Sequence, residues 1–241
     1  MQLPDIARRL VTLGREQGFF SVLGSAVGWA VGWFLGRPTA GRPSRRSFRW
    51  GSREVPYFHH AYNYTWLNER AVEVALALEV LDAHAGGSVL EIGNVLGHYR
   101  TLDHLVVDKY EQAPGVVNAD VADFETDCRF DLILAVSTLE HVGFDESVRD
   151  PEKPARALER LRSLLAPGGR LWVTIPVDYN PDLDRHLRAA DLGFTSVRAL
   201  RRDDRRNRWR EVPLDEVWTA RYDWLLYTAH GVVVAEYAAP S

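Results

Sequence analysis

The feature that most constrains the fold is a series of short apolar runs that alternate with helical or polar segments. The runs occupy residues 88–92, 105–108, 116–118, 130–136 and 170–175, and two more follow at 195–200 and 231–237. Continuous apolar runs are typical of strands that are covered on both faces, as in parallel sheets. Before the fifth run, Asp150 and Pro151 supply an N-cap and a first-turn proline for a crossover helix. The sequence therefore predicts an α/β fold with helices on both faces of a sheet.

The length of 241 residues suits one such domain with additional segments. Apolar residues recur at helical spacing over residues 66–83, and Gly86 and Gly87 follow. We expect this helix to lead into a main domain of residues 67–241. Residues 1–66 then form a helical and aromatic N-terminal extension.

Composition excludes several classes of protein. The single cysteine, Cys128, rules out an intramolecular disulfide framework and a Cys-rich zinc site, which fits a cytoplasmic location. The net charge of -4 argues against a nucleic-acid partner, because neutralising phosphates needs a basic face. Of the 29 Lys and Arg residues, only Lys109 and Lys153 are lysines.

Residues 19–36 contain no charged side chain, and glycines recur there at every fourth position from Gly24 to Gly36. This length is borderline for a membrane span, and the glycine spacing is that of helices that approach closely. Arginines are dense in residues 37–53 and again in 198–210, and such clusters suit an anionic membrane surface. Three interpretations stay open: association with a membrane, a buried helix that packs on the main domain, or a hydrophobic mouth for the substrate.

Residues 48–66 are rich in aromatic side chains. Flat apolar faces with polar tips suit sugar rings or a lid over a ligand. The alternative is that these rings pack the extension onto the core.

Three predicted strands end in an acidic residue. Glu91 ends the first, before a turn that contains Gly93 and Gly97, and Asp108 ends the second. Asp120, beside Val121, follows the third. Because the carboxyl ends of parallel strands share one edge of a sheet, where ligands bind, these residues are candidate ligand contacts. The turn is not G-x-G-x-x-G, so the dinucleotide pyrophosphate motif is missing.

The fourth predicted strand runs into the segment LEHV at residues 139–142, and L-A-P-G-G at 165–169 precedes the fifth. In this order and spacing, residues 70–200 resemble the class I S-adenosylmethionine (SAM)-dependent methyltransferases, particularly the small-molecule, methyltransferase type 11-like kind. The resemblance implies a Rossmann-like sheet and SAM as cofactor. It also implies that Glu91, Gly93 and Gly97 form the loop on the methionine side of SAM, that Asp108 holds the ribose, and that Asp120 and Val121 frame the adenine. Val95 departs from the family pattern, which has a glycine at that position.

Methyl transfer to an alcohol needs a general base, and His141 is the candidate because imidazole titrates near neutral pH. By the same resemblance, Asp178, after the fifth strand, orients this base or binds substrate. A metal-dependent variant would draw on carboxylates, but they show no tight ligand spacing and we expect no metal. The candidate metal ligands are Asp145, Glu146, Asp178 and Asp184.

The sequence thus favours a SAM-dependent O-methyltransferase that acts on a saccharide, a glycolipid or a glycosylated metabolite. Three alternatives remain: an N- or C-methyltransferase acting on a lipid-like small molecule, an inactive methyltransferase-like binding protein, and an NAD-dependent dehydrogenase. The last is disfavoured, because the pyrophosphate glycines and a Tyr-x-x-x-Lys pair are missing. The acceptor and the oligomeric state are not determined by the sequence.

Overall fold

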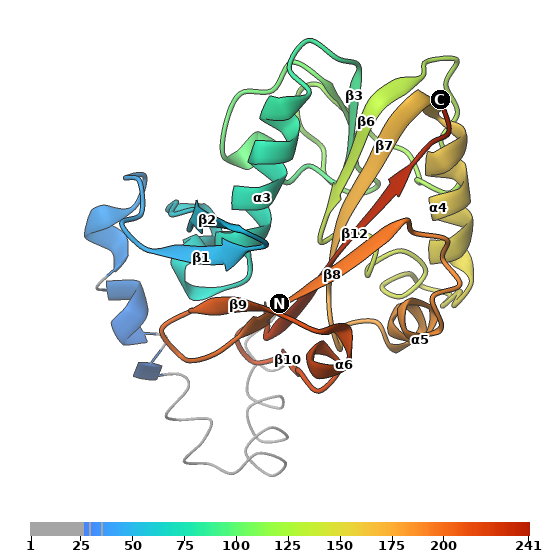
Figure 1. The fold of residues 1–241 in the computed structure, drawn as a ribbon. Coiled ribbons are helices and arrows are strands. Elements are labelled where there is room, and N and C mark those ends of the chain that lie inside the picture. The colour runs from blue at the N-terminus through green and yellow to red at the C-terminus, as the bar shows by residue number, and fades with distance from the viewer. Residues whose placement is uncertain (1–26, 29, 35) are drawn as a thin grey trace.

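The computed structural model describes residues 27–28, 30–34 and 36–241, and its centre is an eight-stranded sheet (Figure 1). The strands of this sheet are β3 (Val89–Ile92), β4 (Leu105–Val107), β5 (Val116–Val117), β6 (Phe130–Val136), β7 (Leu165–Pro176), β8 (Ser196–Arg202), β9 (Trp209–Val212) and β12 (Gly231–Ala238). They correspond closely to the apolar runs of the sequence, with β9 as an addition. The predicted α/β fold is therefore confirmed.

The strand order is β5-β4-β3-β6-β7-β12-β8-β9. The first five strands are parallel to one another, whereas β12 is antiparallel to β7 and β8, and β9 is antiparallel to β8. The chain moves outward from β3 to β5 and then returns to place β6 on the other side of β3. This reversal makes a topological switch point between β3 and β6, which is where ligands bind in open α/β sheets.

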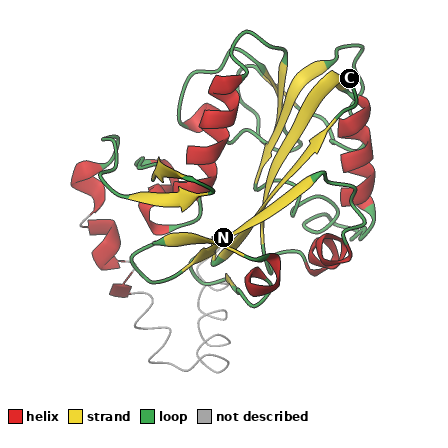
Figure 2. Cartoon of the chain, in the orientation of Figure 1, coloured by secondary structure: helices red, strands yellow, loops and turns green. Residues whose placement is uncertain are grey.

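Helices lie on both sides of the sheet (Figure 2). The longest are α3 (Arg70–Ala83), α4 (Lys153–Ser163) and α5 (Pro181–Ala189), and α6 (Leu214–Val217) is a single turn. Along β6, Leu132 and Leu134 bury into one apolar cluster with α3, while Ile133 and Ala135 bury into a second with α4 and α5. The uninterrupted apolar run of β6 is thus explained by burial on both faces. Residues 93–129, all described, contain no α-helix but one 3-10 turn, η3 (Leu96–His98).

The helix α4 begins later than the sequence predicts. The Asp150 carboxylate does accept a hydrogen bond from the backbone N–H of Glu152, at 3.2 Å, but this closes a separate turn. The regular helix starts at Lys153, and Pro154 occupies its first turn. Similarly, the predicted helix 66–83 is divided into η2 (Tyr62–Leu67) and α3.

The aromatic segment packs in two ways. Its first part forms a hairpin of β1 (Ser47–Trp50) and β2 (Arg53–Pro56), in which Phe48 and Trp50 are buried in the same apolar cluster as α3. The packing is therefore continuous across residue 66. The second part, η2, lies over the switch point and carries two residues with positive φ, Asn63 and Tyr64.

Helical residues lie between 27 and 36, and a 3-10 turn, η1 (Arg37–Thr39), follows. A side chain at Gly32 or Gly36 would collide with Leu67 or Trp66, and the Trp66 indole N–H donates to the Gly32 carbonyl at 3.0 Å. These two glycines therefore pack against the protein's own η2, whereas Gly28 faces open space. Within the described part of the chain, no helix is long and apolar enough to cross a membrane. Most of the predicted segment 19–36 lies outside the described residues.

Two further short strands, β10 (Tyr222–Asp223) and β11 (Thr228–Ala229), pair near the carboxyl end of β7. They bring an aromatic group beside the switch point. In this group Tyr179 contacts Tyr222 and Trp224, each at 4.9 Å between ring centroids.

Candidate active site

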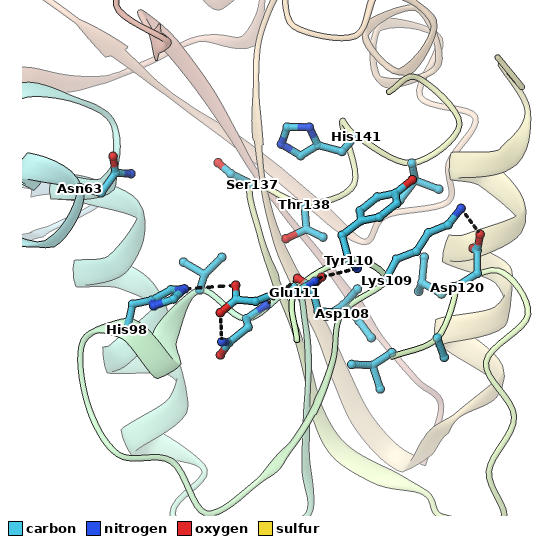
Figure 3. Close-up of a pocket in the computed structure, with 18 of the residues that line it drawn as sticks. Asn63, His98, Asp108, Lys109, Tyr110, Glu111, Asp120, Ser137, Thr138 and His141 are labelled. Atoms are coloured by element: carbon cyan, nitrogen blue, oxygen red, sulfur yellow. Dashed lines mark hydrogen bonds and ion pairs between the residues drawn. The ribbon is translucent and has the colours of Figure 1, made fainter. Parts of the chain in front are cut away.

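A cavity of about 300 Å³ opens at the carboxyl ends of β3, β4, β5 and β6 (Figure 3). Its lining includes residues that follow each of these strands, together with Tyr62 and Asn63 of η2 above it. Its volume is at the lower end of the range for small-molecule sites. The site lies where the switch point predicts.

Glu91 organises the loop after β3. One carboxylate oxygen accepts hydrogen bonds from the backbone N–H groups of Val95, at 3.0 Å, and Leu96, at 2.7 Å. The other oxygen lies 3.0 Å from Nε2 of His104. Glu91 is completely buried and does not line the cavity. Its geometry therefore gives it a positioning role, and direct contact with a cofactor stays a prediction.

The glycines of this loop have different roles. Gly93 lines the cavity with φ +81°, and a Cβ there would lie 2.9 Å from Cγ2 of Thr138. Only glycine fits this conformation without strain. Gly97 lies in η3 outside the cavity lining, and its close neighbour is the Asn94 side chain. Val95, the departure from the family pattern, lines the cavity.

Asp108 lies at the centre of the cavity floor. One of its oxygens accepts from the N–H groups of Tyr110 and Glu111, both at 2.8 Å, and the other accepts from Asn94 N–H at 3.1 Å. Glu111 lines the same cavity, and its two oxygens contact the Asn94 amide, at 2.7 Å, and His98 Nε2, at 3.2 Å. Glu111 is thus a second carboxylate on this wall, which the sequence analysis missed.

Asp120 and Val121 line the far end of the cavity. Asp120 pairs with both lysines of the chain, at 2.7 Å for Lys109 and 2.5 Å for Lys153, and these lysines also pair with Glu146. Partial burial alone would raise the pKa of Asp120, but the two lysines outweigh it and lower the pKa to about 2. Asp120 is therefore an ionised member of a four-residue charge cluster.

The arrangement fits SAM on the chemistry of its donors and acceptors. Each carboxylate oxygen has about two acceptor positions. By that count, Asp108 keeps one position and Glu111 two, which is enough for the two hydroxyls of a ribose. Asp120 keeps one for an adenine amine, and Arg70, which also lines the cavity, is a cation suited to the carboxylate of an amino acid.

His141 lies in the wall of this cavity, after β6. Its Nδ1 is 2.6 Å from Asp145 Oδ2, and the same oxygen accepts from the Tyr179 hydroxyl at 2.6 Å. Burial and the adjacent Asp145 raise the pKa of Tyr179, so this hydroxyl stays protonated and donates. Nε2 of His141 lies 3.6 Å from the nearest Glu140 oxygen, which is too long for a hydrogen bond.

The carboxylate that orients His141 is therefore Asp145, not Asp178. Asp178 has φ +68° and does not line the cavity. Its carboxylate accepts from the backbone N–H of Tyr222 at 3.1 Å and lies 3.5 Å from Arg221. The left-handed turn at Asp178 points its side chain toward the segment before β10. A role for Asp178 in substrate binding stays a prediction.

The carboxylates considered as metal ligands are engaged separately. Asp145 contacts His141, Glu146 contacts the lysines, and Asp184 accepts from the N–H of Asp178 at 2.8 Å. Among the residues that the structure describes, no group of three or more His, Cys, Asp or Glu side chains is placed to hold a metal ion.

Two buried carboxylates, those of Glu73 and Glu140, lie close to Ser137 and His141 of the cavity wall. Glu73 accepts from the Ser137 hydroxyl at 2.6 Å and pairs with Arg70 at 3.2 Å. Glu140 is 2% exposed, and its Oε2 is buried without a hydrogen-bond partner. Burial raises the pKa of Glu140 well above its ordinary value.

Sequence reasoning missed Glu140 and Arg70 as site residues, and it considered Asp145 only as a metal ligand and not as the partner of His141. Asp145 stands four residues after His141, and Glu140 directly before it, so proximity to the proposed base was an available signal. Arg70 lies on α3, distant in sequence, and only the packing of α3 against β6 brings it to the cavity.

No family model matches the sequence, and no curated protein matches it. Among solved structures, it is similar to N-methyltransferase NodS from Bradyrhizobium japonicum WM9 in complex with S-adenosyl-L-homocysteine. The TM-score is 0.45 and the identity 15%, over 72% of this chain and 88% of that one. It is also similar to 1,6-didemethyltoxoflavin-N1-methyltransferase from Burkholderia thailandensis, with TM-score 0.43 and 19% identity over 70% and 79% of the two chains. A third similar structure is the CcbJ methyltransferase from Streptomyces caelestis. Its TM-score is 0.42 and its identity 14%, over 68% of this chain and 88% of that one.

These scores lie below 0.5 and the identities below 25%, so the similarity assigns no substrate. The sheet order and the cavity at its switch point agree with the fold and the cofactor site that the resemblance to class I SAM-dependent methyltransferases implies.

Proposed function

We propose that the protein is an O-methyltransferase that transfers the methyl group of SAM to a hydroxyl of a saccharide, a glycolipid or a glycosylated metabolite. The observation that carries this proposal is the contact between His141 Nδ1 and Asp145, at 2.6 Å, in the wall of the cavity that also contains Asp108. It supplies an oriented base beside a site suited to SAM.

The state of the imidazole follows from its partner. An ionised Asp145 can only accept, so Nδ1 carries the proton and Nε2 of His141 has the free lone pair. SAM supplies a methyl group made electrophilic by its sulfonium. With SAM bound, the acceptor oxygen would take its methyl group while the sulfur keeps the bonding electron pair, and Nε2 of His141 would accept the hydroxyl proton. Asp145 then stabilises the imidazolium.

The aromatic surroundings favour an acceptor with flat apolar faces. Tyr62 stacks on His98 at 4.2 Å and meets Tyr99 edge-on at 5.6 Å between ring centroids. Tyr179 meets His141 edge-on at 4.7 Å. Such rings, with hydroxyl tips, suit the faces of sugars.

A second candidate is N-methylation of an amine. It is favoured by Glu140, whose buried Oε2 has no hydrogen-bond partner and whose Oε1 lies 3.6 Å from Nε2 of His141. A buried polar atom without a hydrogen bond is costly, and an ammonium or amine donor would satisfy it. In that case Glu140 would bind the acceptor, and His141 would remove the proton of the nitrogen.

The test is a library of hydroxyl-bearing and amine-bearing metabolites incubated with SAM labelled in its methyl group. We expect label in hydroxyl acceptors, lost in His141→Ala and retained in His84→Ala, a histidine that contacts the Val80 carbonyl at the end of α3. Label confined to amines supports the second candidate. Calorimetry with SAM covers the case in which no acceptor in the library is labelled. A protein that binds no SAM cannot be the enzyme, and that result would favour the inactive binding protein.

A further inference from the structure

The two arginine-rich segments of the sequence meet in space. Arg46 donates from both terminal guanidinium nitrogens to the backbone carbonyl of Arg206, each at 3.1 Å. The two segments share a cavity of about 880 Å³ beside the N-terminal helical residues. We call it the basic groove, and its arginines are Arg42, Arg45, Arg46, Arg205 and Arg206.

The basic groove has an unbalanced charge. None of the described residues that line it is acidic, although the whole chain carries a net charge of -4. Many arginines elsewhere pair with carboxylates, as Arg53 does with Glu79 at 2.7 Å. Within the described residues, Arg42, Arg45 and Arg205 are exposed and are paired with no carboxylate. Such a concentration of guanidinium groups is complementary to phosphate.

An exposed apolar stripe borders the basic groove. Val27, Val31 and Phe34 are 54%, 52% and 72% exposed, and their spacing of four and three residues places them on one face of a helix. Val31 also lines the groove. The glycine side of this helix is already occupied by Trp66 and Leu67, so the apolar stripe faces outward.

We propose that this face binds the surface of a membrane rich in anionic phospholipid. The lipid phosphates would enter the basic groove, while Val27, Val31 and Phe34 insert at the boundary of the acyl chains. The N-terminal helical residues and β1 lie on the side of the molecule opposite α4 and α5 (Figure 1), so docking leaves that side free. This proposal is independent of the methyl acceptor.

The test is flotation of the full-length protein with vesicles of phosphatidylcholine alone or mixed with phosphatidylglycerol. The variant R42Q/R45Q/R205Q removes three unpaired groove arginines. The variant R129Q/R156Q/R185Q removes the same charge from exposed positions outside the groove. Circular dichroism would check that both variants are folded.

We expect wild type and the control variant to float only with the phosphatidylglycerol vesicles, and 0.5 M salt, at about a 4 Å Debye length, to release them. The groove variant should bind about a hundredfold more weakly, since each arginine near such a surface contributes about fivefold. Phe34→Ser should also weaken flotation. The proposal is wrong if the wild type does not float, if it floats equally with neutral vesicles, or if the two triple variants lose equal binding. It is also wrong if inorganic phosphate at constant ionic strength releases the protein, because that would indicate a site for soluble anions.

Discussion

Replacement of Asp108 by asparagine should weaken SAM binding without unfolding the protein. Asp108 accepts three backbone hydrogen bonds and keeps one acceptor position toward the cavity. The substitution removes its charge and exchanges one oxygen for an N–H donor. A hydrogen bond to a charged group contributes about 1.5–3 kcal/mol, so the Kd for SAM should rise about 13- to 150-fold.

Isothermal titration calorimetry measures this Kd directly and needs no acceptor. The matched control is Asp103→Asn, which removes the same charge from an exposed position outside the cavity lining. The melting temperature reports whether the loops after β3 and β4 remain ordered. An unchanged Kd in a folded Asp108→Asn variant, or an equal loss in the control, would refute the assignment of this cavity to the cofactor.

Three other expectations concern the same site. His141→Ala should lower turnover about 10²- to 10⁴-fold with SAM affinity nearly unchanged; a wild-type rate would make His141 structural. Gly93→Ala should lose about 1–3 kcal/mol of stability, measured by urea unfolding, because φ is +81° and the new Cβ meets Thr138; an unchanged midpoint contradicts this. Because its lysine partners lower the pKa of Asp120 to about 2, the stability that this pairing contributes is present above pH 4 and is lost as the pH falls toward 2. Lys153→Met should therefore destabilise by about 1 kcal/mol at pH 7, and the difference from wild type should shrink between pH 4 and 2; a constant difference would show that Lys153 acts through packing.

Much of the fold could be read from the sequence because the strands of a parallel sheet are buried on both faces. Such strands leave an unbroken apolar run, and β6 matches its predicted run at both ends. The predicted start of α4 was wrong by a few residues, because a local hydrogen bond competes with the helix there. The Asp150 carboxylate accepts from Glu152 N–H and closes a separate turn before α4 begins. The antiparallel pairing of β12 with β7 and β8 depends on how distant segments meet, and no local pattern encodes it.

The site divides in the same way. The positions of Glu91, Asp108 and Asp120 after three predicted strands were enough to group these carboxylates, because residues after parallel strands must share one edge of the sheet. It could not determine what those carboxylates contact. The folded chain shows that Asp145, and not Asp178, contacts His141, because a left-handed turn points the Asp178 side chain away. Likewise, only folding brought Arg46 and Arg206 together across 160 residues of chain, because contacts at such separations are set by packing and not by local spacing.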